Sequence, residues 1–131
     1  MSDKVQSYLV DLGLSFEEIG DRTWLINDEE KGLKNLVVMV SEPVVILRIK
    51  VMELPAERRE ELFERLLRLN AEDLLHGAYA VEGDGVILLD TLELGSMDLE
   101  ELRASLEAIG LALVQHYKIL NPYRQADVGR S

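Results

Sequence analysis

Two neighbouring β-branched runs constrain the fold of this chain most strongly. They are LKNLVVMV, residues 33–40, and VVILRIKVM, residues 44–52, and only Ser41-Glu42-Pro43 separates them. Branched side chains pack well on a pleated surface, and a short polar segment with proline is typical of a turn. The two runs therefore predict an antiparallel β-hairpin, whose strands are the most hydrophobic in the chain.

The two predicted strands distribute their apolar residues differently. In the second strand, apolar residues alternate with Arg48 and Lys50, which indicates one covered face and one open face. In the first strand both faces are apolar, with Leu36, Val38 and Val40 on one side and Val37 and Met39 on the other. Helices can cover one face of a sheet, so we expect the other face to meet a partner subunit or a bound segment.

The remaining elements follow from local patterns. Helices are expected over residues 3–12, capped by Ser2, then from Pro55 at the first helical position to about residue 70, and from Asp98, which forms a capping box with Glu101. Further strands are expected over residues 14–19 and 22–26. The order α-ββββ-α-ββ-α predicts an α+β fold, an antiparallel sheet packed by helices. We expect one domain over residues 1–123 and a flexible tail over 124–131.

The segment Glu82-Gly83-Asp84-Gly85 offers three interpretations. A calcium loop needs oxygen ligands spread over about 12 residues, but Val-Ile-Leu-Leu follows directly. A phosphate-binding loop would open a helix, whereas this segment opens a strand. A tight hairpin turn fits best, and we expect Gly85 to supply the positive φ that such a turn needs.

Composition excludes several classes of partner and site. The 131 residues include 25 acidic and 14 basic ones, a formal charge of −11, and no cysteine. A surface this acidic repels phosphate backbones and anionic lipid, so neither nucleic-acid nor membrane binding is expected. Basic partner segments would be attracted, although solubility alone also explains such a charge. No signal peptide or membrane span is visible, which predicts a cytoplasmic protein.

Catalytic and metal-binding motifs are missing from the sequence. His76 and His116 belong to no metal-ligand spacing, and no serine lies in a nucleophile motif. We therefore expect a non-enzymatic protein without a cofactor or metal. The alternative is a small enzyme or ligand-binding domain whose site combines scattered carboxylates with His76 and His116.

Two sets of residues are candidates for contacts with other chains. Trp24, Val37, Met39 and Met52 lie on predicted strands, and Trp and Met adapt well to varied partners, although core packing is the alternative. The second half of the last helix, AIGLALVQHYKIL, is apolar on almost every side. Such a helix must be covered on more than one side, either by its own sheet or by a second copy of the chain. We expect Leu111 and Val114 to lie in a homodimer contact.

The stretch LLRLNAEDLLHGAYAVEGDGVILLDTLELGSMDLEELRASLEAI, within residues 65–110, resembles the YbjN-like bacterial family of sensory-transduction regulators. The shared pattern is a helix ending in Leu69-Asn70, a Gly/Asp hairpin, a long strand and an acidic-capped final helix. The resemblance implies the fold of type III secretion chaperones, which bind extended segments of other proteins and are often dimeric. No binding residue of that family matches here. We expect a chaperone-like or regulatory protein-interaction module, a homodimer with a protein partner.

Overall fold

The computed structural model describes residues 3–124, and this part of the chain forms six strands and three α-helices in the predicted order α-ββββ-α-ββ-α. The elements are α1 (Lys4–Asp11), β1 (Phe16–Gly20), β2 (Thr23–Asp28), β3 (Leu33–Ser41), β4 (Val44–Glu53), α2 (Arg59–Glu72), β5 (Ala78–Glu82), β6 (Gly85–Glu93) and α3 (Leu99–Leu120). Two short 3-10 helices, η1 (Glu29–Lys31) and η2 (Asn121–Tyr123), precede β3 and follow α3. Of the predicted tail, residues 125–131 lie outside the described residues.

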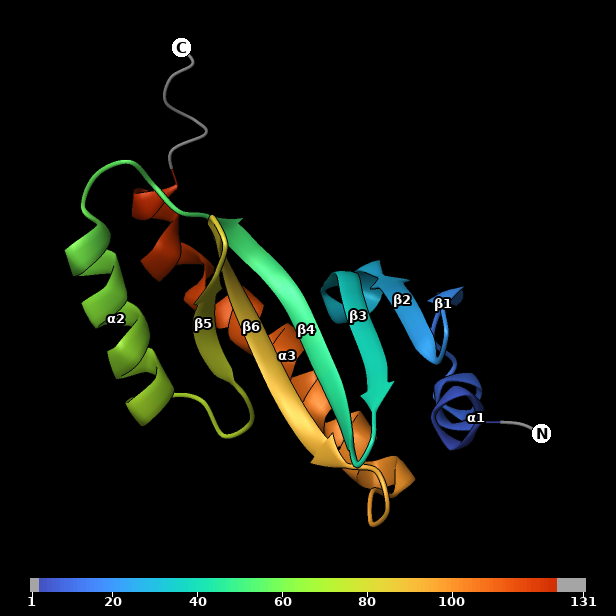
Figure 1. Cartoon of the computed structure of the whole chain (residues 1–131). Helices are drawn as coiled ribbons and strands as arrows, with labels where there is room; N and C mark the ends of the chain where they lie inside the picture. The colour runs from blue at the N-terminus through green and yellow to red at the C-terminus, as the bar shows by residue number, and fades with distance from the viewer. Residues whose placement is uncertain (1–2, 125–131) are drawn as a thin grey trace.

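All six strands form one antiparallel sheet, in the order β1-β2-β3-β4-β6-β5 (Figure 1). The predicted central hairpin is β3 and β4, which pair from Val37 opposite Arg48 to Ser41 opposite Val44. The longest pairing joins β4 to β6, along almost the whole of both strands. The antiparallel α+β fold predicted from the sequence is confirmed.

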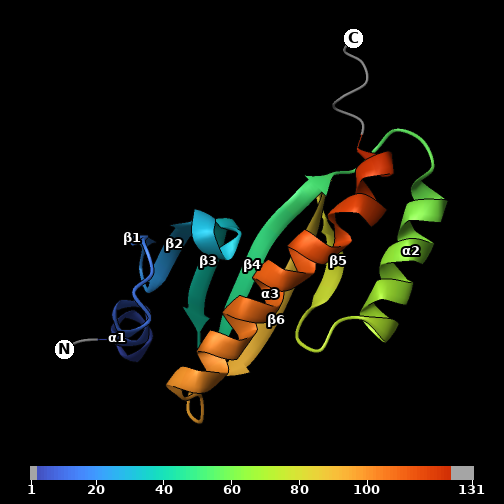
Figure 2. The same cartoon turned by 180° about the vertical axis from the view of Figure 1, so that it is seen from behind.

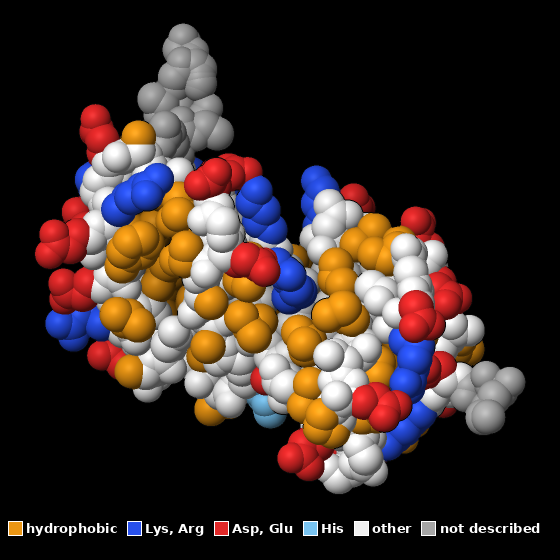
Figure 3. Space-filling model, in the orientation of Figure 1, with side chains coloured by type: hydrophobic (Ala, Val, Ile, Leu, Met, Phe, Trp, Pro, Cys, Tyr) orange, Lys and Arg blue, Asp and Glu red, His pale blue; other side chains and the backbone are white. Residues whose placement is uncertain are grey.

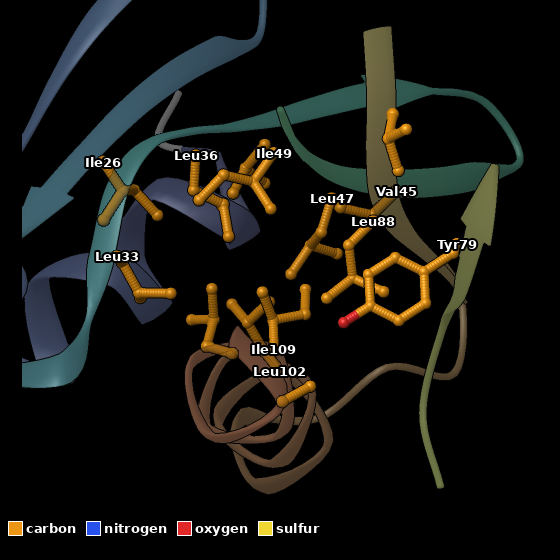
Figure 4. Packing of buried hydrophobic residues seen from close by; sticks show 14 of the residues in the cluster. Ile26, Leu33, Leu36, Val45, Leu47, Ile49, Tyr79, Leu88, Leu102 and Ile109 are labelled. Carbon is orange, nitrogen blue, oxygen red and sulfur yellow. The ribbon is translucent and has the colours of Figure 1, made fainter. Parts of the chain in front are cut away.

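The helices lie against one face of this sheet and leave the other face uncovered. α3 runs diagonally across the sheet, α1 lies at the β1–β2 end, and α2 lies beside the edge strand β5 (Figure 2). Side chains from the covered face, among them Leu36, Leu47 and Leu88, point toward Leu102 and Ile109 of α3 (Figure 4). The core therefore occupies the space between the sheet and α3.

Capping determines where two of the helices begin. The Asp98 side chain accepts a hydrogen bond from the Glu101 backbone N, and the Glu101 side chain accepts one from the Asp98 backbone N, which is the predicted capping box. α1 is capped by Asp3, whose Oδ1 accepts from Val5 N at 2.9 Å. The sequence had suggested Ser2 for this cap, and Ser2 lies outside the described residues.

The predicted start of α2 is wrong. Proline is favoured at the first helical position, but here the helix begins four residues after Pro55, at Arg59. Arg58 adopts a left-handed conformation with φ 64°, which a continuous helix cannot contain. The intervening residues carry the chain from the end of β4 across to the side of β5, and this crossing delays the helix.

The hairpin between β5 and β6 is confirmed, but with a different glycine in the special conformation. Glu82 pairs with Gly85, so Gly83 and Asp84 are the two central turn residues. Gly83 has φ 58°, as the first central residue of a type II′ turn requires, whereas Gly85 has no positive φ. Gly85 begins β6, and a Cβ there would lie 3.1 Å from Lys50 Cε.

The edge strand β5 is closed by a side chain rather than by another strand. The Asn70 amide at the end of α2 accepts a hydrogen bond from Tyr79 N at 2.7 Å and donates one to Tyr79 O at 3.2 Å. An unpaired strand edge invites association with other chains, and covering it with a helix is one way to prevent that. Asn70, part of the Leu-Asn pattern noted in the sequence, ties α2 to this edge.

Candidate interaction site

The uncovered face of the sheet carries a set of apolar side chains outside the core cluster that packs under the helices, and one of them, Ile87, is itself only 9% exposed. We call this set the open face, and it consists of Leu25, Val37, Met39, Ile46, Ile87 and Leu89. The pairing places Leu25 opposite Val37 and Met39 opposite Ile46, so the set continues from strand to strand. Figure 3 shows hydrophobic side chains gathered over the strands on this side of the molecule. No helix of the described chain covers them (Figure 1).

Charged side chains interrupt this apolar surface. Arg48 stands in the row between Val37 and Leu89 and forms an ion pair with Glu82 of β5. Lys50, one step further along β4, forms an ion pair with Glu53. A bound segment that crosses the sheet here would therefore meet Leu25 and Val37, then Arg48, then Leu89.

Two of the four predicted partner-binding residues lie instead in the core. Trp24 is 1% exposed and faces the helices, where its Nε1 donates to Gln6 Oε1 of α1 at 2.9 Å. Because α1 covers this end of the sheet, the alternation in β2 directs Trp24 inward. The exposed position predicted for Trp24 is wrong.

Met52 is 5% exposed, and a β-bulge explains why its predicted position is also wrong. Lys50 pairs with Ile87, but Met52 pairs with Val86, the next residue along β6, so Val51 is an extra residue. A one-residue insertion reverses which face the following side chains meet. Met52 therefore turns to the covered face with Val86.

The other predicted contact residues remain accessible. Val37 and Met39 are half-buried on the open face. On α3, Leu111 is 57% exposed and Val114 is 67% exposed, while Ile109 and Ala112 beside them are buried against the sheet. The apolar second half of α3 is thus covered on one side only, and the two predicted dimer residues are free to meet another chain.

The central hairpin opens at one end into a fork. Residues 33–36 of β3 pair with β2 and residues 49–53 of β4 pair with β6, but these two segments do not pair with each other. A second bulge lies on the β3 arm, because Lys34 and Asn35 together stand opposite Asn27 alone. Asn35 has φ 60°, and its N donates to Asn27 Oδ1 at 2.9 Å. Bulges bend a strand and increase its twist, so the bulges on the two arms account for the fork.

A groove of about 700 Å³ lies at this fork, and we call it the fork groove. Its apolar floor includes Ile49 of β4 and Leu113 and Tyr117 of α3. Lys34, Lys50, Glu53 and Arg124 provide its charged groups. In Figure 3 the surface is hollowed at the open end of the fork, with Lys or Arg side chains on both sides of the hollow. Its volume is in the range of pockets that bind ligands.

The fork groove could not be found from the sequence, because its lining comes from strands and a helix that are distant along the chain. One signal was present. Lys34 and Asn35 together interrupt the apolar run, and asparagine is one of the few residues that tolerate a left-handed conformation. An asparagine at that point is consistent with a bulge.

A buried polar contact lies between β5, α3 and the end of α2. The hydroxyl of Tyr79 is 2.6 Å from His116 Nδ1, and His116 Nε2 is 3.4 Å from Asp73 Oδ2. Burial raises the pKa of Tyr79 to about 12, with the Asp73 carboxylate acting in the same direction and Arg124 opposing it. The phenol therefore stays neutral and lies at hydrogen-bonding distance from the ring nitrogen.

The structure does not bring together the two histidines named in the alternative interpretation of the sequence. His116 is buried and meets a single carboxylate, while His76 lies exposed in the turn before β5. Within residues 3–124, no group of three or more His, Asp or Glu side chains could hold a metal ion. The described helices also include none that is long and apolar enough to cross a membrane.

Comparisons with solved structures show the same fold. A chain of the heterodimeric ExoU–SpcU complex from the type III secretion system of Pseudomonas aeruginosa matches 90% of this chain and 98% of its own, with a TM-score of 0.72 at 17% identity. YbjN from E. coli matches 87% of this chain and 89% of its own, with a TM-score of 0.65 at 17% identity. A further match is the Yersinia pestis type III secretion chaperone SycH in complex with a fragment of YscM2, with 84% and 93% coverage, a TM-score of 0.57 and 19% identity.

The sequence comparison is decisive for the family. No curated protein is similar enough to count as a match. The sequence profile of the family CesT_Tir_1, however, matches residues 1–126, nearly the whole chain. The resemblance to YbjN-like and chaperone proteins noted in the sequence is confirmed by this match and by the structural comparisons. The chain therefore belongs to the CesT_Tir_1 family.

Proposed function

We propose that this protein is a non-enzymatic chaperone that binds an extended segment of another protein along the open face of its sheet. The observation that carries the proposal is that apolar side chains from four neighbouring strands share a face that no described helix covers. Apolar side chains gathered on an uncovered face with charged groups among them are typical of an interaction site. Two of the similar structures come from chaperone complexes with other proteins.

The chemistry of the open face suits a protein segment better than a small molecule. Its apolar side chains extend over four strands with the ion-paired Arg48 among them, which suits an extended segment that carries both apolar and polar side chains. The net charge of −11 favours partner segments that also carry Lys or Arg. Met39 is half-buried on β3, near the turn of the hairpin, and lies within this surface.

Substitution of Met39 tests the proposal. Met39→Asp places a charge on the open face without touching the core, so partner capture from native cytoplasm should be lost while the melting temperature changes little. Val10→Asp is the matched control, because Val10 is 60% exposed on α1 and lies outside the open face. Equal loss of capture in both variants would contradict the proposal, as would unfolding of Met39→Asp alone.

A homodimer is the second part of the proposal, and α3 supplies its contact. Leu111 and Val114 present apolar side chains on the outer side of this helix, where a second copy of the chain would cover them. Leu111→Glu and Val114→Glu should shift the protein to a monomer, because an unpaired charge in a contact costs several kcal/mol. Size-exclusion chromatography with light scattering measures this. A wild type that is monomeric at tens of micromolar would exclude the dimer.

A further inference from the structure

The fork groove carries a local charge opposite to that of the whole protein. Three cations, Lys34, Lys50 and Arg124, line it together with a single carboxylate, Glu53. The chain as a whole carries 25 acidic and 14 basic residues. Of these cations, Lys50 forms an ion pair with Glu53. Lys34 forms no ion pair with any described residue. The groove is therefore a small basic region on an acidic molecule.

Arg124 is held in place at this groove with hydrogen-bonding capacity to spare. Its Nη1 donates to Val51 O at 3.1 Å, and its guanidinium lies 5.3 Å from the centre of the Tyr117 ring. Its Nε is buried and has no hydrogen-bond partner among the described residues. A carboxylate is the acceptor that the guanidinium group of an arginine recognises best.

The backbone of the fork is also incomplete as a sheet. Val51 O, on the arm of β4, accepts from the Arg124 side chain and not from a strand, because β3 has turned away at this point. Beneath it, Ile49, Leu113 and Tyr117 form an apolar floor. A ligand that fits must combine an apolar group, a carboxylate and an extended backbone.

We propose that the fork groove binds an extended acidic and apolar segment of the protein partner, with an apolar side chain on the floor and a carboxylate among Lys34, Lys50 and Arg124. The inference rests on the proposed function, because it names the chemistry of one part of the bound segment. Net charge alone suggests that the whole partner segment is basic, whereas the cations of the groove favour acidic residues at this one place. The partner would carry basic residues elsewhere and acidic residues where it enters the fork.

The negative charge of the protein does not prevent this binding. Screening limits interactions between exposed charges to about 8 Å at physiological ionic strength. At contact distance the nearest groups decide the sign of the interaction, and those are the three cations of the groove. Overall charge slows the approach of an acidic segment but does not set its final affinity.

Three labelled peptides of about nine residues, about 30 Å long when extended, would test the inference on the full chain. They share alternating leucines and carry aspartate, serine or lysine between them. Fluorescence anisotropy should show that the aspartate peptide binds at least about tenfold more tightly than the lysine peptide, as two or three exposed charge pairs together provide. The serine peptide should lie between them.

Two variants locate the binding at the fork. Lys34→Glu should lower the affinity for the aspartate peptide by roughly threefold to tenfold and raise the affinity for the lysine peptide. The Tyr117 side chain is 54% exposed. Tyr117→Ala should lower the affinity for both peptides, because it removes an apolar contact for their leucines. Arg65→Glu, an exposed cation of α2 outside the groove, is the control and should leave all three affinities unchanged.

The outcomes separate this inference from the proposed function. Equal affinity for the three peptides, a preference for lysine, or an equal effect of Arg65→Glu would overturn the groove assignment. If partner capture still depends on Met39 in that case, the open face remains the binding site and only the fork inference fails. If capture does not depend on Met39 but the aspartate peptide binds as described, the open face fails and the fork stands.

Discussion

The covered face and the open face are made from alternate residues of the same strands, yet only one of them is sealed. On β6, Leu88 is fully buried against α3, whereas its neighbour Leu89 is half-buried on the other side. Both are leucines, so their chemistry cannot explain the difference. The position of the helices does, because all three lie against one side of the sheet (Figures 1 and 2).

This contrast shows that apolar residues on a sheet divide into two roles. Those on the covered face exclude water within the chain and hold the fold together. Those on the open face gain little from the chain's own folding, so their burial is available to an association with another molecule. The following predictions test this division, starting with the largest effect.

The largest effect is expected for a pair of identical substitutions on neighbouring residues. Leu88→Ala should lower the free energy of unfolding by about 2–5 kcal/mol, since it leaves a cavity against α3. Leu89→Ala should lower it by less than about 1 kcal/mol, because its side chain is already partly in water. Urea unfolding of both variants measures the difference. Equal losses would mean that the two faces are equally sealed.

The covered face should also respond to alkaline pH through Tyr79. Its folded-state pKa, raised to about 12 by burial, lies above the ordinary value of about 10. The neutral phenol is favoured in the folded chain, so this contribution is complete below about pH 10 and is lost as the pH rises toward 12. Wild type should thus lose up to about 2–3 kcal/mol across this window beyond what Tyr79→Phe loses.

Unfolding measured between pH 9 and 12 would show this difference in slope. Tyr117→Phe removes a hydroxyl from a tyrosine that is 54% exposed and serves as the control. A Tyr79→Phe variant with the slope of the wild type would show that this phenol is not protected by burial.

A smaller effect is expected at Asn70, whose side chain is hydrogen-bonded to the backbone of the edge strand β5. Asn70→Ala removes both hydrogen bonds to the Tyr79 backbone and should lower stability by about 1–2 kcal/mol. It also uncovers the edge of β5, so light scattering should show slow self-association. Asn70→Asp, which keeps the acceptor for Tyr79 N, should lose less. If Asn70→Ala changes neither stability nor association, the edge is protected by α2 without this side chain.

The smallest effect is expected for the ion pair on the open face. Arg48 and Glu82 have side chains that are 38% and 53% exposed, so Glu82→Gln should lower stability by less than about 1 kcal/mol. High salt should remove the difference. The Arg68–Glu64 pair on α2 offers a comparison, with Glu64→Gln expected to behave in the same way. A loss of several kcal/mol at Glu82 would show that the open face contributes to the fold after all.

Local patterns were sufficient to predict the elements and their order. The alternation in residues 47–50, the Gly/Asp turn and the Asp98–Glu101 capping box each act within a few residues, so each is visible in the sequence. Leu111 and Val114 are candidate dimer residues because the second half of the last helix is apolar on almost every side, and both are exposed on the described chain. Whether they join two chains remains a prediction.

Errors arose where the outcome depends on distant parts of the chain. Continuing the alternation of residues 47–50 predicts Met52 on the open face, but the bulge at Val51, which exists only in relation to β6, turns Met52 to the covered face. The pattern of β2 alone does not reveal that α1 lies over that end of the sheet and buries Trp24. The start of α2 was placed at Pro55 because the left-handed conformation of Arg58 has no sequence signal.

The sequence by itself thus determined the fold class, the succession of helices and strands, and the absence of local catalytic motifs. These depend on backbone preferences and on side-chain periods that operate over a few residues. Only the tertiary structure decided which face of the sheet is open, where β3 leaves β4, and which cations gather at the fork. Those features are set by packing between segments far apart in the chain, where a bulge of one residue or the position of one helix reverses what each side chain meets.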